Sequence, residues 1–446
     1  MVRSAAWAVG LVAVMSLRAF AEPVPAAAGT GDYDQRLAAM EQELEELKLG
    51  MAEEAGKSKA PGTFRAFWDK GLKFATADGD FKMAIGGRVQ YDLGWISQDE
   101  DSRKAFGDLP DGTEFRRLRL EATGDIYRNG FFKIQMDFAG GSANLKDAYV
   151  GIKGVPLFGS LVAGHMYEPF CLDTQTSSKY IEFMERSLIH EAFSPDRQDG
   201  IAFFNTALND RLYYKAGLFR TSDDFGVLQS DAGYSMTGRV VGVPWNEDGG
   251  ARFAHVGLSG SHRGMKDGNT LQYRTRPEWH LSTKRFVDTG AMKNVDSADL
   301  LGLEGSLVLG PFALQGEYIA AMTTAGAGGE DHTFDGFYVQ GSYWLTGEHR
   351  NFKIAEGVYD RVTPKKNFGK DGWGAWEAAV RYSTISLNDG SGTPAVKGGE
   401  ESNLTFGLNW HLNPNMRVMF NYTKSDLKNP DKGSSDMIGV RFQADF

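Results

Sequence analysis

The sequence predicts an all-β protein, a transmembrane antiparallel β-barrel of about sixteen strands that follows a short N-terminal helix. Three observations predict this class: an export signal, many segments of about ten residues in which apolar and polar side chains alternate, and a last strand that ends in Phe446. Beyond the N-terminus no apolar run reaches the roughly 18 residues of a transmembrane helix. A membrane-spanning form of this chain must therefore be a barrel.

The N-terminus has the three parts of a secretory signal peptide, predicted here as residues 1–21. Arg3 precedes the apolar stretch 5–17, and "AFA" at 19–21 matches a cleavage site. A membrane anchor is the alternative, but the apolar run is too short. Cleavage removes two arginines and leaves 46 basic and 58 acidic residues, a net charge of −12. That charge argues against a nucleic-acid partner, and the single Cys171 excludes an intramolecular disulfide.

Residues 32–55 form a predicted periplasmic coiled-coil helix. Its apolar residues are spaced 4, 3, 4, 3 and 4 apart, which is a heptad seam of under three heptads: Tyr33, Leu37, Met40, Leu44, Leu47 and Met51. Such a seam favours oligomerisation, and the alternatives are a single helix lying on another surface or a contact with the cell wall. Residues 56–80 are predicted to be a linker that leads into the barrel.

The predicted barrel, residues 81–446, follows from side chains that alternate between apolar and polar at every second residue. In 403–412, for example, Leu404, Phe406 and Leu408 alternate with polar residues and glycine. A β-sandwich would show the same alternation, and the export signal and terminal Phe favour the barrel. The predicted strands are 81–95, 114–127, 130–139, 145–153, 158–166, 199–208, 211–220, 233–243, 252–263, 299–309, 312–321, 335–345, 374–387, 401–412, 415–425 and 436–446.

Connection lengths test this assignment, because outer-membrane barrels alternate short periplasmic turns with long external loops. Tight turns fall at Asn129-Gly130, Asn209-Asp210, Gly310-Pro311 and Asn413-Pro414. A strand at 270–281 would break the alternation, so 264–298 is predicted to be one long loop. The segment 346–373 is an exception, a long connection on the turn side that the sequence does not explain.

A second long connection, about 167–198, is predicted to fold into the barrel and narrow it. Loops of this length inside a compact fold are usually functional, and a barrel of this size is too wide for side chains to fill. Ile181, Met184, Leu188 and Ala192 share one helical face, so residues 177–193 are predicted to be an amphipathic helix. An external lid is the alternative.

Enzyme functions find little support. The histidines show no H-E-x-x-H or similar metal-ligand spacing, and the chain has no G-x-S-x-G motif. An outer-membrane phospholipase needs a Ser/His pair, for which His165 and His255 are weak candidates. No enzyme activity, cofactor or metal is predicted.

A series of short motifs resembles the phosphate-selective porin O and P family, over roughly residues 64–446. The motifs are "KMAIGGRVQYD" (82–92), "FRRLRLEATGDIY" (115–127), "LKDAYVGIKG" (145–154), "EPF" (168–170), "TSSKYIEFMERSL" (176–188), "YRTRP" (273–277), "YWLTGE" (343–348) and "GAWEAAVRYS" (374–383). The resemblance implies a sixteen-stranded barrel that forms trimers in the outer membrane. It also implies an anion-selective constriction built by an arginine ladder and an inward loop.

The resemblance implies a set of pore residues: Arg88, Arg116, Arg117 and Arg186, with Arg274 and Arg276 from a long loop and Ser177 and Ser178 from "TSSK". Two positions depart from the family pattern, because Arg119 replaces a tyrosine and Lys146 replaces an aspartate. The family's external lysine cluster is largely absent, with Thr174 at one of its positions. The barrel therefore resembles the family better than its phosphate specificity does.

Because successive side chains of a strand point to opposite faces, the sequence predicts in part which way the arginines point. If Leu118 and Leu120 face lipid, Arg117 and Arg119 face the lumen, where they avoid the roughly 2–4 kcal/mol cost of a cation on the lipid face at midplane. Strict parity points Arg116 outward, unless it lies above the hydrocarbon or a β-bulge turns it inward.

Net loop charge does not decide selectivity, because residues 167–200 carry −4 and residues 264–298 carry +2. A row of Arg88, Arg117, Arg119, Lys146 and Arg186 at the constriction would select anions, and Arg suits phosphate. The alternative is that these residues form ordinary lumen ion pairs with Glu121, Asp137, Glu182 or Glu185.

The sequence thus predicts a homotrimeric outer-membrane porin for passive diffusion of small anions such as phosphate, with outer-membrane lipid around it. A general or cation-preferring porin and a cell-wall tether are the alternatives.

Overall fold

The computed structural model describes residues 63–69, 71–222, 233–265, 270–390, 395–428 and 430–446. The predicted signal peptide (1–21) and coiled-coil helix (32–55) lie outside these residues and stay predictions. Within the described ranges, no helix is long and apolar enough to cross a membrane.

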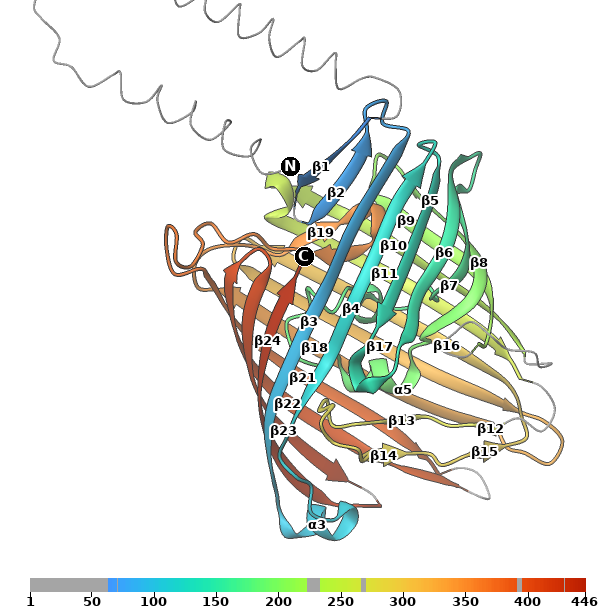
Figure 1. Cartoon of the computed structure of the whole chain (residues 1–446). Helices are drawn as coiled ribbons and strands as arrows, with labels where there is room; N and C mark the ends of the chain where they lie inside the picture. Colours follow the sequence, from blue (N-terminus) through green and yellow to red (C-terminus); the bar gives the residue numbers. More distant parts are fainter. Residues whose placement is uncertain (1–62, 70, 223–232, 266–269, 391–394, 429) are drawn as a thin grey trace, which may run out of the picture. The chain divides into compact units, whose positions relative to one another are not determined.

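The described strands include sixteen that form one closed antiparallel sheet, as predicted (Figure 1). The barrel closes where the last strand pairs with the first, from Ser435 opposite Gln98 to Asp445 opposite Arg88. In chain order the strands are β3 (Phe81–Gln98), β4 (Gly112–Ile126), β5 (Gly130–Asp137), β6 (Asn144–Val155), β7 (Gly159–Tyr167), β8 (Arg197–Ala207), β9 (Leu212–Arg220), β10 (Tyr234–Glu247), β11 (Arg252–Gly264), β16 (Val295–Leu309), β17 (Phe312–Ala325), β18 (His332–Trp344), β21 (Ala375–Asp389), β22 (Val396–Asn413), β23 (Met416–Lys428) and β24 (Gly433–Asp445).

The alternation of side chains has the predicted direction. On β22, Asn403 is fully buried on the lumen side, whereas the neighbouring Leu404 and Phe406 are 39% and 49% exposed on the outer face. Each predicted strand overlaps one observed strand, and the four predicted tight turns join neighbouring strands. The period of two therefore fixes which face meets lipid, because adjacent strand residues point to opposite sides.

A short hairpin extends the wall beyond the C-terminus. Within the segment predicted as a linker, β1 (Phe64–Trp68) pairs with β2 (Leu72–Thr76), and β2 pairs with the start of β3. Phe446 exchanges hydrogen bonds with the backbone of Gly87 on β3, donating at 3.3 Å and accepting at 2.9 Å. The hairpin thus continues the barrel edge where the last strand ends.

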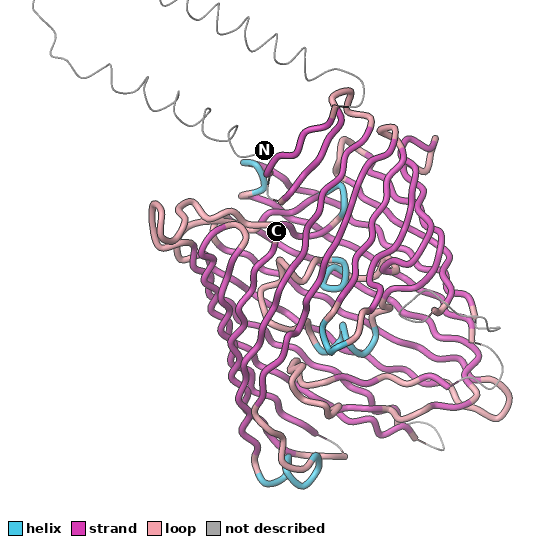
Figure 2. The backbone as a smooth tube through the Cα atoms, viewed as in Figure 1, coloured by secondary structure: helices cyan, strands magenta, loops and turns pink. Residues whose placement is uncertain are grey.

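Three long connections hold most of the remaining elements (Figure 2), and α3, η1 and η2 lie in shorter ones. The predicted loop 264–298 is one connection between β11 and β16, residues 265–294, whose described residues form two small two-stranded ladders and no barrel strand. The remaining elements are α3 (Glu100–Phe106), η1 (Ala139–Gly141), α4 (Leu172–Gln175), α5 (Leu188–Phe193), η2 (Asp248–Gly250), β12 (Thr270–Leu271), β13 (Arg274–Thr275), β14 (Val287–Asp288), β15 (Met292–Lys293), β19 (Asn351–Lys353), η3 (Ile354–Glu356) and β20 (Val358–Asp360).

Candidate functional site: a cation-lined cavity in the barrel

The connection between β7 and β8, residues 168–196, folds into the barrel and is called the inward loop (Figure 1). Phe170, Leu172 and Leu188 are fully buried inside the barrel. The predicted amphipathic helix over 177–193 is wrong, because only Leu188–Phe193 are helical in this stretch. Residues 177–187 are turns and bends.

The barrel wall explains why this segment is not a helix. Lumen-facing side chains donate hydrogen bonds to the loop carbonyls that a helix would use internally. Arg417 donates to Ile181 at 2.8 Å, and Asn409 donates to Glu182 at 2.8 Å. Gln90 and Arg381 donate in the same way to Ser178 and Glu185. These tertiary hydrogen bonds override the helical pattern of the sequence.

Arg441 is the most heavily paired of these wall anchors. It is fully buried, and it binds Asp92 at 2.6 and 2.7 Å and Glu185 at 2.8 Å. A further hydrogen bond runs from Arg441 to the carbonyl of Met184. The sequence analysis missed this residue, although its lumen parity in "GVRFQ" was a signal that could have found it.

One cavity of about 260 Å³ lies between the inward loop and the wall formed by β3 to β8. Eight cationic side chains and two carboxylates are among its lining residues. The cations are Arg88, Arg116, Arg117, Arg119, Lys133, Lys146, Arg186 and Arg197, and the carboxylates are Asp147 and Asp196. Ser177 and Ser178 also line it, so eight of the ten residues named from the sequence meet here.

Two β-bulges bring Arg116 and Lys146 into this group. Between β3 and β4 the register passes from Gln90–Arg117 to Tyr91–Phe115, which leaves Arg116 as an extra residue. A second register shift, between β5 and β6, lets Lys146 line the cavity although it neighbours the buried Asp147. A bulge places two successive side chains on nearly the same face. The open question about Arg116 is thus answered: it turns inward.

Several of the cations have carboxylate partners. Arg116 binds Glu185 through two hydrogen bonds of 2.8 and 2.9 Å. Arg119 binds Asp137 at 2.7 Å, and Arg197 binds Asp147 at 2.7 Å. Of these three, only Arg119 belongs to the predicted row, and its pair with Asp137 fits the alternative of lumen ion pairs.

Arg117, Lys146 and Arg88 are neutralised less or not at all. Among the described residues, neither Arg117 nor Lys146 has a carboxylate within 4.0 Å, and Arg117 is held by Gln90 at 2.8 Å. Arg88 donates to Ser178 at 2.7 Å and to Ser177 at 3.2 Å, with Glu121 more distant at 3.9 Å. Positive charge therefore remains in excess at the cavity.

The cations also set the ionisation of nearby loop groups. Burial opposes ionisation of Glu185, but Arg116, Arg117 and Arg441 hold its pKa well below the usual range. Burial and the neighbouring Arg186 hold the pKa of His190 well below the usual range. Glu185 is therefore ionised and His190 neutral near pH 7.

Two groups of predicted site residues have other surroundings. Arg186 donates to the carbonyls of Asp173 and Thr176 at 2.6 and 2.7 Å, so it braces the inward loop from within. Arg276 pairs with Glu191 at 2.6 Å in an adjoining cavity of about 140 Å³. Arg274 lies on β13, outside both cavities.

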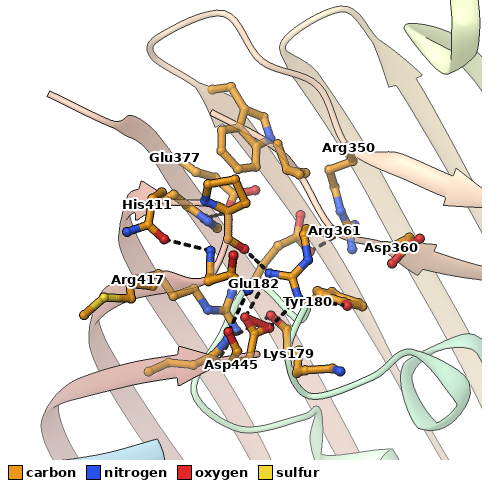
Figure 3. A pocket seen from close by; sticks show the side chains of 17 residues that line it. Lys179, Tyr180, Glu182, Arg350, Asp360, Arg361, Glu377, His411, Arg417 and Asp445 are labelled. Carbon is orange, nitrogen blue, oxygen red and sulfur yellow. Dashed lines mark hydrogen bonds and ion pairs between the residues drawn. The ribbon is translucent and has the colours of Figure 1, made fainter. Parts of the chain in front are cut away.

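The segment 346–373, unexplained by the sequence, supports the inward loop from the turn side. Arg350 binds Glu182 at 3.1 Å, and Arg361 binds Asp445 through two hydrogen bonds of 2.8 Å. Figure 3 shows these side chains converging with Tyr180 where the loop, this segment and the C-terminal strand meet. The segment thus packs into the lumen and holds the loop tip.

Comparison with known proteins identifies the architecture. Residues 83–446 match the family described as phosphate-selective porin O and P. The chain belongs to this family. It is 27% identical to Porin O of Pseudomonas aeruginosa over 404 residues, which cover 83% of this chain and 89% of that protein. It is also 29% identical over 406 residues to an uncharacterized protein of Caulobacter vibrioides, covering 85% of this chain and 76% of that protein.

Solved structures agree on the fold. An anion-selective porin from Comamonas acidovorans superposes with a TM-score of 0.53 and 14% identity, covering 82% of this chain and all of that one. The protein is therefore an outer-membrane porin, a channel and not an enzyme.

Three neighbouring cavities of this porin lie along the wall of β3 to β9. The 140 Å³ and 260 Å³ cavities share Arg116, Arg117, Arg186 and His190. Lys133 and Gln175 line both the 260 Å³ cavity and a wide vestibule of about 1060 Å³ at the turn side. The vestibule is lined by seven cations, missed by the sequence analysis, and three carboxylates; the cations are Arg65, Lys73, Lys82, Lys133, Lys153, Lys215 and Lys353.

The loop 264–298 of the porin contacts β3 at a glycine, Gly94. A Cβ added to Gly94 would lie 2.2 Å from the ring of Trp279 and 2.6 Å from Leu281. We expect Gly94→Ala to lift this loop and to raise the single-channel conductance measurably, because the ring has to move. Gly260→Ala is the matched control, since its nearest atom would be 3.8 Å away. Equal conductance of the two variants would contradict the expectation.

Proposed function

We propose that the protein is a trimeric, anion-selective porin through which small anions, phosphate or polyphosphate-like ions among them, diffuse passively. The observation that carries the proposal is the excess of cations at the cavity: eight cationic and two carboxylate side chains line it. Arg116, Arg119 and Arg197 have carboxylate partners, but Arg117 and Lys146 have none within 4.0 Å among the described residues. A pore selects by the charge at its narrowest part.

The surroundings support this proposal. Cations line the vestibule in excess as well, so a permeating anion meets positive charge there too. The family description includes phosphate selectivity, and the Comamonas porin is described as anion-selective. Ser177 and Ser178 beside Arg88 add hydroxyl donors of the kind that phosphate accepts. The trimer is carried over from the family resemblance.

Reversal potentials in a KCl gradient across planar bilayers test the selectivity. We expect a chloride-selective potential, and a cation-selective one would overturn the proposal while leaving the porin assignment intact. Added phosphate is expected to reduce the chloride current, because it would occupy the arginine-lined cavity and leave it more slowly. Chemical crosslinking of the purified protein tests the trimer.

A further inference from the structure

Three aromatic rings project toward the vestibule from the lumen face of β5, β6 and β8. Phe131 lies at the centre and meets Tyr149 at 6.4 Å and Phe204 at 6.3 Å between ring centroids, both edge to face. All three line the 1060 Å³ vestibule. Together they form an aromatic cluster, called the ring platform below.

A buried apolar cluster adjoins the ring platform. Val162, Met166, Ala202 and Phe219 are each at most 3% exposed and pack together, with the three rings against them. Lumen faces of wide barrels are normally polar. The wall of β5 to β9 departs from that pattern, and nothing in the passage of a small inorganic anion requires it.

Each ring of the platform has a lysine beside it. Lys133 lies directly across from Tyr149 in the register of β5 and β6, and Lys215 lies directly across from Phe204 in that of β8 and β9. The ammonium of Lys153 sits 5.8 Å from the centroid of Phe131. Aromatic surface and positive charge thus alternate across one wall of the vestibule.

The three lysines differ in how far they are neutralised. Lys133 pairs with Asp147 at 2.8 Å, and Lys153 pairs with Asp125 at 2.5 Å. Lys215 has no ion pair within 4.0 Å in the described part of the chain. An anionic group placed at Lys215 would therefore meet an uncompensated charge, with the ring of Phe204 next to it.

We propose that the ring platform and Lys215 form a binding site for organic anions that carry an aromatic ring beside a phosphate or carboxylate group. The ligand ring packs on Phe131 and Phe204, and its anionic group binds Lys215. The inference rests on the proposed function in that the ligand is an anion, and it extends the substrates beyond inorganic phosphate. Ring contacts supply affinity that a phosphate ion alone lacks.

The experiment compares phenyl phosphate with methyl phosphate as blockers of the KCl current through the full-length porin. The two have the same anionic group and differ in the ring. Phenyl phosphate added on the turn side is expected to block at a concentration about fivefold lower than methyl phosphate, the factor that one aromatic contact contributes.

Three variants locate the site. The double variant Phe131→Leu/Phe204→Leu keeps the side chains apolar and is expected to abolish the preference for phenyl phosphate while leaving the block by methyl phosphate unchanged. Lys215→Gln is expected to weaken the block by phenyl phosphate. Phe203→Leu is the matched control, since Phe203 is the neighbour of Phe204 on β8 and lies outside the vestibule lining.

The outcomes separate the two proposals. Cation selectivity in the KCl gradient would overturn the proposed function. An anion-selective pore that phenyl phosphate blocks no better than methyl phosphate would overturn the ring site alone. A preference that survives the double variant would also overturn it, because the ring would then bind elsewhere.

Discussion

Replacing Arg117 by Gln is expected to lower the ratio of anion to cation permeability by about fivefold. One unit charge acting at about 4 Å in water is worth about 1 kcal/mol, which corresponds to that factor. Arg117 has no carboxylate partner within 4.0 Å among the described residues, so its charge is not cancelled locally. Reversal potentials in a KCl gradient measure the change, and Arg117→Glu is expected to reduce the ratio further.

Arg252→Gln serves as the control for this substitution. Arg252 begins β11 beside a turn, is half exposed, and already pairs with Glu247 and Asp248. It does not line any of the three neighbouring cavities, so its loss is expected to leave selectivity unchanged. If both substitutions shifted the reversal potential equally, overall charge and not the cavity would set selectivity.

Replacing Arg441 by Gln is expected to release the inward loop. The substitution leaves Asp92 without its buried partner and removes contacts to Glu185 and Met184. Breaking a buried ion pair lowers the free energy of unfolding by about 3–5 kcal/mol. We expect a loss near the low end of this range, because water in the lumen can hydrate the unpaired Asp92. The single-channel conductance should rise and become noisier, and the temperature at which the folded barrel unfolds on electrophoresis should fall.

The double variant Asp92→Asn/Arg441→Gln separates the two effects. Removing both charges eliminates the unpaired carboxylate, so most of the lost thermal stability should return. The loop contacts stay absent, and the raised conductance should persist. A wild-type conductance in both variants would show that Arg441 does not hold the loop.

The strands were predictable because the lipid imposes a rule at every second residue. A lumen side chain such as Asn403 and a lipid-facing one such as Phe406 differ in polarity, and the difference repeats along each strand. Turn lengths added a second constraint, which removed the false strand at 270–281. The alternation and the turn lengths both come from residues close together in the sequence. They can therefore be recognised in a single sequence.

The candidate site was predictable only in part. The resemblance named Arg88, Arg117 and the two serines, and these residues do meet in one cavity. The sequence did not reveal which cations are neutralised, because Asp137 and Asp147 reach their partners across strands. It also missed Lys215, whose place beside Phe204 depends on the register of β8 and β9.

The helical pattern of 177–187 failed for a related reason. Helix propensity is a weak preference that tertiary hydrogen bonds override, and here donors on distant strands take the loop carbonyls. The segment 346–373 gave no usable pattern, since its role depends on Arg350 and Arg361 reaching the loop tip and the C-terminal strand.

By itself the sequence determined the barrel, its strand number and the face that each regular strand residue presents, because these follow from a period of two and from connection lengths. The tertiary structure alone decided the direction of Arg116 and Lys146, the non-helical course of the inward loop and the excess of charge at the cavity. A bulge, an ion pair and a loop anchor each depend on which residues lie opposite one another, and that register is set by closure of the whole barrel.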